Sequence, residues 1–350
     1  MAYKILILGA SYGSLLGTKL LMAGHDVTLV CRSETAAVIN GEGTNVQIKL
    51  RGEDSHRHIL SGDQPGNLDA QAPGEVDLAG YDMVALAMAE PQYGSPDIRA
   101  LMKRIGDARL PCLSIMNMPP LAYLKRIEGL NANGLESAYN CPDVWKDFDP
   151  EMVTLCSPDP QAYRLPDAGP NVLHVGLPTN FKAARFANGA HQAMLLQIEA
   201  DIAAVRLDGQ DVPVKLRVFD SLFVPFAKWS MLLTGNYRCV LSDGERSIKD
   251  AVHGDIEKSR GIYGHVESIV RHFGADADDL VPFEKYAKAA ENLLKPSSAA
   301  RSIASGALAV ERVDFLVNSI AEQIGKPNAD IANVVNCLND RLAANKRQVA

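Results

Sequence analysis

The sequence predicts an α/β protein with a doubly wound, largely parallel sheet in its N-terminal part and a mostly α-helical C-terminal domain. Three observations lead to this fold class. Strand-like and helix-like apolar patterns alternate in the first part of the chain, a glycine-rich turn joins the first strand to the first helix, and almost only helical periodicity follows residue 219. We place the domains at residues 1–218 and 219–350, because a chain of 350 residues fits two domains better than one.

The first thirty residues have the pattern of a βαβ unit. Residues 4–8 form a short apolar run that is followed at once by glycine. Residues 14–23 carry apolar side chains at helical spacing and stop at Gly24, and residues 27–31 form a second apolar run. A strand, a tight turn, a helix and a second strand in this order are typical of a Rossmann-type domain.

The remaining elements of the first domain follow in order. Residues 83–88 and 110–116 are apolar without alternation, which is typical of buried parallel strands, and a helix is expected between them at 98–105. From about 140 to 178 Pro and Asp are frequent, which indicates short antiparallel additions to the sheet. We also expect an edge hairpin strand at 46–50, a long helix at 181–205 and a last strand at 212–218.

The second domain is expected to consist of helices. Helical periodicity with glycine and proline breaks covers residues 219–233, 247–273, 282–294, 309–324 and 330–344. Their apolar faces suggest a homodimer.

Composition excludes several classes of protein. The net charge of −7 and the absence of a long basic run argue against a partner that is nucleic acid or a membrane surface. No apolar run approaches the ~18 residues of a membrane span, so we expect a cytoplasmic protein. The six cysteines are scattered and His56 with His58 lacks a third ligand, so no metal site is expected.

The turn after the first strand allows two functional interpretations. Gly9 to Gly13 spells G-x-S-x-G, the pattern of a hydrolase elbow with Ser11 as nucleophile. An elbow normally follows several strands and needs a histidine on a later loop, whereas this turn follows the first strand. A phosphate-binding loop fits better, because Gly9 ends the strand, Gly13 opens the helix and Gly17 allows close packing on the strand. A tight turn without a ligand is the remaining alternative.

The end of the second strand favours NADP(H) over NAD(H) as the cofactor. An NAD site places an acidic residue there to bind the ribose 2′-hydroxyl, but this chain has Arg32, and Glu34 lies two residues further on. A guanidinium suits a 2′-phosphate. The residues expected to bind the cofactor are Gly9, Ala10, Ser11, Tyr12, Gly13, Ser14 and Arg32.

The opening segment GASYGSLLGTKLLMAGHDVTLVCR resembles that of the ketopantoate reductases (2-dehydropantoate 2-reductases). Four later segments are similar to that family as well: AAVINGEGTNVQIKL, LSIMNMPP, AKWSMLLTGNYRCVL and KPSSAARSI. The resemblance implies an NADP(H)-dependent oxidoreductase that reduces a 2-oxo acid by hydride transfer, with a Rossmann domain followed by a helical domain.

The resemblance also implies roles for single residues. Lys228 matches the catalytic lysine, which orients the keto group and protonates the alkoxide. Asn117 matches an asparagine near both the nicotinamide and the substrate, and Asn236 and Ser298 match substrate-binding residues. Glu311 is nearest to the family's second-domain glutamate, at a spacing that differs by one residue.

The sequence departs from the family's pattern at several positions, two of them polar. Leu232 replaces an asparagine, Ala89 a lysine and Met118 a glycine. Losing polar groups from a pocket usually changes the substrate. We therefore expect a small-molecule substrate other than ketopantoate: a bulkier or less polar 2-oxo acid, another carbonyl compound or an imine. The alternatives are a non-catalytic NADP-binding protein and an opine-type dehydrogenase that acts on a C=N bond.

Overall fold

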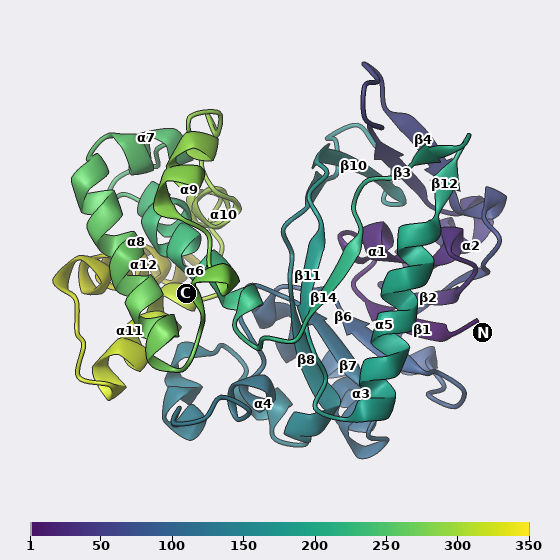
Figure 1. The fold of residues 1–350 in the computed structure, drawn as a ribbon, viewed down its shortest axis with the longest axis horizontal. Helices are drawn as coiled ribbons and strands as arrows, with labels where there is room; N and C mark the ends of the chain where they lie inside the picture. The colour runs from purple at the N-terminus through teal and green to yellow at the C-terminus, as the bar shows by residue number, and fades with distance from the viewer. Residues whose placement is uncertain (1, 350) are drawn as a thin grey trace. The chain divides into compact units, whose positions relative to one another are not determined.

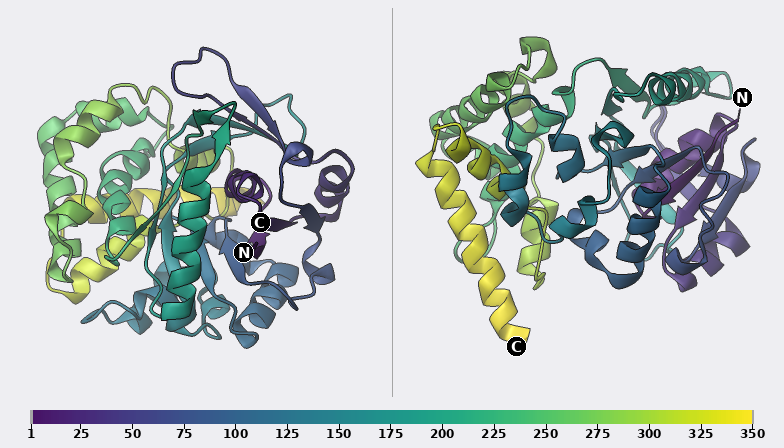
Figure 2. Two further views of the ribbon diagram at one scale, coloured as in Figure 1. Left: turned by 45° about the vertical axis from the view of Figure 1, so that its right-hand side comes forward. Right: turned by 90° about the horizontal axis from the view of Figure 1, so that it is seen from below.

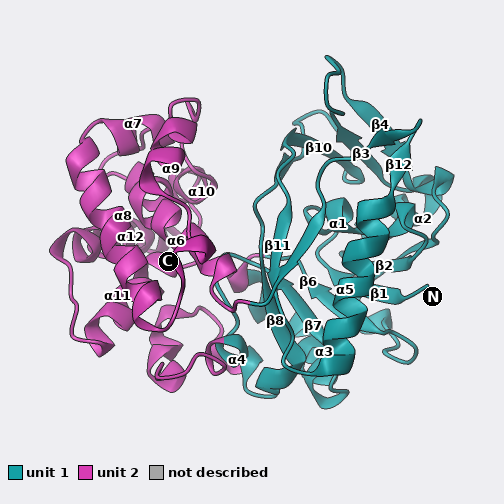
Figure 3. Ribbon diagram, in the orientation of Figure 1, with its two compact units in different colours: residues 1–88, 92–123, 144–220 teal, residues 89–91, 124–143, 221–350 magenta. Residues whose placement is uncertain are grey.

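The structure is a computed structural model that describes residues 2–349, and it contains two compact units (Figure 3). The units do not follow from one cut in the chain. Unit 1 runs to Met88 and includes Gln92–Tyr123 and Val144–Asp220, whereas unit 2 includes Ala89–Pro91 and Leu124–Asp143 and resumes at Ser221.

Unit 1 is built on a sheet with the strand order β14-β11-β8-β7-β6-β1-β2-β5. The run from β5 to β8 is parallel throughout. This order reverses between β1 and β6, as in a doubly wound Rossmann-type sheet, so the predicted fold class is confirmed. The strands are β1 (Lys4–Leu8), β2 (Asp26–Val30), β5 (Leu68–Gln71), β6 (Met83–Leu86), β7 (Cys112–Ile115), β8 (Val153–Ser157), β11 (Phe181–Ala184) and β14 (Leu216–Phe219).

Helices cover this sheet and complete its core. Helix α1 (Gly13–Met22) packs on β2 and beside α5 (Gly189–Ala204), and α5 in turn packs on β14 (Figures 1 and 2). Helix α2 (Ser33–Glu42) packs on β5, and α3 (Pro96–Asp107) joins β6 to β7. Apolar side chains of β1, β2, α1 and α5 form one buried cluster, which holds the start of α1 firmly against the end of β1.

The prediction of a long helix at 181–205 is wrong for its first third. Residues Phe181–Ala184 form strand β11, which pairs antiparallel with β8, and α5 begins only after Asn188. The Asn188 side chain accepts hydrogen bonds from the backbone N–H groups of Ala190 and His191 and so caps the helix. The antiparallel addition to the sheet was expected, but its position was not.

A second sheet in unit 1 has the order β4-β3-β10-β9. Strand β3 (Asn45–Ile48) forms a hairpin with β4 (Arg57–Leu60), as expected. It is not an edge strand, however, because β10 (Val172–Leu177) pairs with its other side and β9 (Gln161–Tyr163) follows β10. Strand β10 lies more than a hundred residues from β3 along the chain, so the local sequence gave no sign of this pairing. A short hairpin, β12 (Arg206–Leu207) with β13 (Gln210–Asp211), follows α5.

Unit 2 is helical, as predicted. Its helices are α6 (Ala227–Met231), α7 (Ile248–His253), α8 (Ile256–His272), α9 (Phe283–Ala290), α10 (Ser298–Ala304), α11 (Val313–Gln323) and α12 (Ala329–Val349). Helix α6 continues into a π-helical segment at Leu232–Asn236. The single helix expected at 247–273 is broken, because Asp255 leaves the helical conformation with φ −149° and ψ 89°. Its side chain caps α8 by accepting from the Lys258 N–H. Helix α4 (Leu121–Leu124) leads from unit 1 into the segment 124–143.

Three general features of residues 2–349 bear on function. No described helix combines the length and the apolar character that a membrane span needs. The described part holds no group of three or more His, Cys, Asp or Glu side chains arranged to bind a metal ion. Its cysteines are free thiols, and only Cys31 and Cys337 are not fully buried.

Candidate functional site

The glycine loop of unit 1 lies where the strand order reverses. Gly9 follows β1 directly and has φ +105°, a conformation that L side chains rarely adopt. A Cβ atom on Gly9 would lie 2.7 Å from the Ala87 carbonyl oxygen, at the end of β6. The loop therefore crosses the carboxyl ends of β1 and β6, the crevice where open α/β sheets bind ligands, and only glycine fits there.

The start of α1 offers unused hydrogen-bond donors to an anion. Within residues 2–349, the backbone N–H groups of Ser11, Tyr12 and Ser14 donate no hydrogen bond. Among the described residues no side chain caps this helix, and its first turn holds no Asp or Glu. The Ser14 hydroxyl donates to the Ser11 carbonyl at 2.8 Å and so fixes the turn. Free N–H groups at the positive end of a helix dipole fit the pyrophosphate of a dinucleotide.

The side chain of Tyr12 serves packing and does not line the anion site. Its hydroxyl donates to the Pro160 carbonyl oxygen at 2.7 Å, and its ring meets Phe181 edge-on at 6.0 Å between centroids. Burial raises the pKa of this phenol far above its usual range, and Cys156 and Asp159 add to the shift. Tyr12 can therefore offer a ligand only its backbone N–H.

The structure gives no support to the hydrolase interpretation of Ser11. In the part of the chain that is described, no hydrogen bond joins the Ser11 hydroxyl to a histidine, and Ser11 is exposed. A serine nucleophile needs such a base within hydrogen-bond reach.

Sequence reasoning found one arginine just after β2, and the structure adds a second that acts electrostatically on the same segment. Arg32 is exposed and stands at the start of α2 in extended conformation. Arg164, just after β9, acts electrostatically on Cys31, the residue before Arg32. Burial raises the pKa of the Cys31 thiol to about 11, while the Arg164 guanidinium opposes the shift. Arg164 was missed because only the pairing of the second sheet brings it to this strand end.

Unit 2 holds four of the candidate residues, beginning with Lys228. This half-buried lysine lies on α6 between Phe226 and Trp229, whose rings stack at 4.1 Å between centroids. In a regular α-helix Asn236, eight residues on, would lie about 80° away around the axis. The π-helical segment takes more residues per turn and brings Asn236 back toward the face of Lys228.

Asn236 lies next to the serine pair that begins α10. The Ser297 hydroxyl donates to the Asn236 carbonyl oxygen at 2.7 Å and also accepts from the Ala300 N–H as helix cap. Ser297 is buried, whereas Ser298, the predicted contact, is exposed on the first residue of the helix. Sequence reasoning did not assign Ser297, which fixes both Asn236 and the start of α10.

Glu311 lies near the same residues, just before α11. Its carboxylate accepts from the Glu90 N–H at 3.3 Å, and its carbonyl oxygen accepts from the Tyr237 hydroxyl at 2.7 Å. Arg312, which competed for this role in the sequence, is buried in an ion pair with Asp314 at 2.8 Å. Arg312 is therefore engaged elsewhere, and the substrate-binding role of Glu311 stays a prediction.

Comparisons with known proteins agree with this architecture. No family model and no curated protein matches the sequence. Solved structures do match. A PanE/ApbA family ketopantoate reductase from Ralstonia eutropha JMP134 is 17% identical with a TM-score of 0.64, over 98% of this chain and 99% of that chain. The 2-dehydropantoate 2-reductase from Methylococcus capsulatus is 14% identical with a TM-score of 0.65, over 97% of both chains.

The chain has the fold of the ketopantoate reductases. The fold that the opening segment implied is thereby confirmed. A D-mandelate dehydrogenase in complex with NADH and anilino(oxo)acetate shares this fold at 13% identity, with a TM-score of 0.64 over 98% of this chain and 99% of that chain.

Within the ketopantoate reductase fold, two of the departures from the family's sequence pattern are buried and apolar. Leu232, where an asparagine was expected, is 5% exposed, and Met118, after Asn117, is fully buried. Asn117 itself follows β7 in unit 1 and is half-buried. Buried apolar side chains cannot hydrogen-bond a substrate, so Leu232 does not supply the polar group that an asparagine would offer.

Proposed function

We propose that the protein is an NADP(H)-dependent oxidoreductase that reduces a 2-oxo acid or related carbonyl compound. The observation that carries the proposal is the turn from Gly9 to Ser14, which presents free N–H groups at the reversal of a doubly wound sheet. Such a turn is built to hold the pyrophosphate of a dinucleotide.

The residues of unit 1 fit NADP(H) better than NAD(H). The backbone from Gly9 to Ser14 would hold the pyrophosphate, and Arg32 with Arg164 would hold the 2′-phosphate. Two cations at the end of β2 favour a dianion there, and neither Cys31 nor Arg32 can accept a hydrogen bond from a ribose hydroxyl as a carboxylate does. Bound NADPH supplies a hydride.

Lys228 would supply charge stabilisation and a proton. Reduction of a carbonyl builds negative charge on oxygen, and an ammonium held close to that oxygen stabilises the charge and donates the proton. Asn117, Asn236, Ser298 and Glu311 would orient the substrate through hydrogen bonds, and Ser297 would keep Asn236 in position.

The substrate is proposed to be less polar than ketopantoate. Leu232 and Ala89 stand where the family's pattern has an asparagine and a lysine, and a substrate group that would pair with those polar side chains would lose its partner here. A 2-oxo acid with a branched or aromatic side chain is therefore the first choice. An imine is the alternative, because an ammonium can also protonate the nitrogen that forms from a C=N bond.

The proposal is tested by titrating NADPH and NADH into the full chain and then assaying a panel of 2-oxo acids and imines. Lys228→Ala is expected to lower kcat by about 10²- to 10⁴-fold without weakening cofactor binding. Lys288→Ala, at an exposed lysine of unit 2, is the matched control and should change nothing.

Each alternative has a distinct outcome. NADPH binding without turnover of any compound, in both the wild type and Lys228→Ala, would make the protein a non-catalytic NADP-binding protein. Turnover of imines alone would assign it to C=N reduction. Failure to bind either dinucleotide would overturn the proposal.

A further inference from the structure

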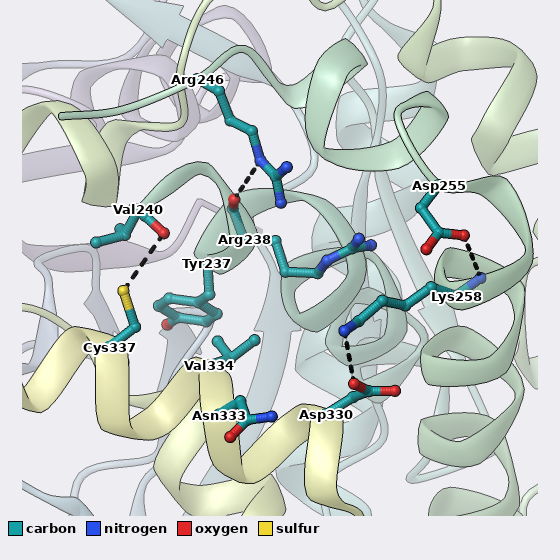
Figure 4. A pocket seen from close by; sticks show the side chains of 10 residues that line it. All are labelled: Tyr237, Arg238, Val240, Arg246, Asp255, Lys258, Asp330, Asn333, Val334 and Cys337. Atoms are coloured by element: carbon teal, nitrogen blue, oxygen red, sulfur yellow. Dashed lines mark hydrogen bonds and ion pairs between the residues drawn. The ribbon is translucent and has the colours of Figure 1, made fainter. Parts of the chain in front are cut away.

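A pocket of about 330 Å³ lies within unit 2, apart from Lys228 and Ser298, neither of which lines it. It opens between the turn after the π-helical segment, the start of α8 and the start of α12 (Figure 4). Its charged lining residues are Arg238, Arg246, Asp255, Lys258 and Asp330. The lining thus contains three basic and two acidic side chains.

Arg238 is a buried cation without a carboxylate partner. The residue is only 7% exposed, and its guanidinium donates to the Thr234 carbonyl oxygen at 3.1 Å and the Ser259 hydroxyl at 2.7 Å. Both acceptors are neutral, and within residues 2–349 Arg238 forms no ion pair. A buried charge that is not neutralised is unfavourable. Burial lowers the pKa of Arg238 and Arg246 adds to the shift, while the charges of Asp255 and Asp330 oppose it.

Hydrogen bonds to the backbone hold Arg246 next to Arg238. The Arg246 side-chain Nε donates to the Arg238 carbonyl oxygen at 2.8 Å, and its backbone N–H donates to the Cys239 carbonyl at 3.0 Å. Arg341 donates to the Leu241 carbonyl at 3.0 Å and so pins the turn that carries Arg246. The two arginines are therefore held together by hydrogen bonds although their charges repel.

The acidic residues of the pocket are already engaged. Asp330 forms an ion pair with Lys258 at 2.7 Å, and Asp255 accepts from the Lys258 backbone N–H at 3.0 Å as the cap of α8. Figure 4 shows both contacts, with the Arg238 and Arg246 guanidinium groups turned into the same space. Both carboxylates thus contact Lys258, and among the described residues neither forms an ion pair with Arg238 or Arg246.

We propose that Arg238 and Arg246 form a binding site for a small oxyanion, the phosphate or carboxylate group of a metabolite. Guanidinium groups bind these groups through paired, charge-assisted hydrogen bonds. Tyr237 and Val334 supply apolar walls beside the arginines, which suits an anion with an organic part. The site is separate from the proposed dinucleotide site in unit 1 and does not depend on the proposed function.

Cys337 provides a direct measure of occupancy. It lines the same pocket, is partly exposed, and donates from Sγ to the Val240 carbonyl at 3.6 Å. Cys31, the other cysteine that is not fully buried, lies in unit 1 and reports separately on anions that bind there. The alkylation rate of each thiol is followed by peptide mass spectrometry, with inorganic phosphate or malonate exchanged for chloride at constant ionic strength.

Phosphate or malonate is expected to slow alkylation of Cys337, by about tenfold at a concentration ten times Kd. Arg246→Gln should abolish this protection, whereas Arg260→Gln, at an exposed arginine of the same unit, should keep it. Arg238→Gln is expected to act like Arg246→Gln where the variant folds. The more potent of the two anions indicates whether the site takes a phosphate or a dicarboxylate.

The proposal is overturned by a Cys337 rate that neither anion changes, or by protection that persists in Arg246→Gln. A slowing that Cys31 and Cys337 share in every variant would also overturn it, because it would report on the reagent and not on the pocket. Loss of protection in Arg246→Gln with an unchanged Cys31 rate supports it.

Discussion

Arg32 and Arg164 act on the same end of β2 from two distant parts of the chain. Cys31 follows the strand and Arg32 comes next, and Arg164 acts electrostatically on the Cys31 thiol. A single arginine at a strand end is compatible with a solvated loop charge, but a second one at the same place favours an anionic ligand.

Replacing either arginine by alanine should weaken NADPH binding by about 10- to 100-fold, since each loses hydrogen bonds to a charged group worth about 1.5–3 kcal/mol. NADH binding should be nearly unchanged, because NADH lacks the 2′-phosphate. Isothermal titration calorimetry with both cofactors measures the ratio of the NADPH and NADH dissociation constants for each variant. Arg99→Ala, at an exposed site on α3, is the control. Equal losses for NADPH and NADH would contradict the assignment.

Lys19 is a buried lysine of α1 that the proposed chemistry does not use. The residue is 1% exposed, and its ammonium donates to the Pro213 carbonyl oxygen at 3.2 Å and to the Val212 carbonyl oxygen at 3.4 Å. The next residue, Val214, has φ +63°, which is rare for a β-branched side chain. Burial lowers the pKa of Lys19 to about 7, and Lys215 adds to the shift.

This shift predicts how stability depends on pH. Between about pH 7 and the usual lysine pKa of about 10.4, the unfolded chain binds a proton that the folded chain does not. The free energy of unfolding should therefore rise with pH in this range. Relative to Lys19→Met, the wild type should gain about 1–3 kcal/mol between about pH 7 and about pH 9.

Urea unfolding of both proteins at the two pH values measures this difference. A constant difference between wild type and Lys19→Met would mean that the lysine keeps its proton in the folded state. Lys103→Met, at an exposed lysine, should show no such pH dependence.

At the scale of elements, the two glycines of α1, Gly13 and Gly17, differ in how closely the neighbouring strands approach them. A Cβ atom on Gly13 would lie 2.6 Å from Ile7 Cγ2 in β1, whereas one on Gly17 would meet Val27 Cγ1 at 3.4 Å and Ile7 Cδ1 at 3.5 Å. The close contact between α1 and β1 thus depends on Gly13. Gly17 has room for a methyl group, although the sequence pattern had suggested that Gly17 is the residue that allows close packing on the strand.

Gly13→Ala should therefore destabilise the protein by about 1–3 kcal/mol through overpacking, and it should also weaken NADPH binding because the start of α1 must shift. Gly17→Ala should be neutral or stabilising by up to about 1 kcal/mol, since alanine favours a helix interior. Thermal unfolding with and without NADPH compares the two. Equal destabilisation by both changes would contradict the difference in packing.

At the scale of the whole molecule, unit 2 takes segments from the first half of the chain. The Glu90 carboxylate is fully buried and accepts from the Asn140 side chain, from the Asn140 backbone N–H at 2.9 Å and from the Cys141 N–H at 2.9 Å. The Asn140 side chain also donates to the Val310 carbonyl at 3.0 Å. The segment 124–143 thus belongs with α11 and not with the sheet that precedes it.

A fragment of residues 1–218 should therefore fold poorly on its own. It would keep the segment 124–143 and lose the helices that cover it, which exposes apolar side chains such as Leu135. Size-exclusion chromatography and circular dichroism of the fragment, beside the full chain, test this. A soluble monomeric fragment with a cooperative unfolding transition would contradict it. Whether the full chain is a homodimer stays a prediction.

The sequence by itself determined the features that depend on local pattern. The glycine turn after the first strand, the buried strands of the parallel sheet and the helical second domain each rest on residues close together in the chain. Backbone conformation and amphipathic periodicity are local properties, so these predictions were sound. The errors at Phe181–Ala184 and at the break before α8 lie where a strand partner or a capping side chain decides between similar apolar patterns.

Only the tertiary structure decided what distant segments do together. It brought Arg164 to the end of β2, Ser297 to Asn236, and Arg246 to the buried Arg238. It also assigned residues 124–143 to the helical unit. Such pairings arise from the burial of surfaces that are far apart in the chain, and a side chain's charge or hydroxyl gives no sign of its partner until the core that positions both has formed.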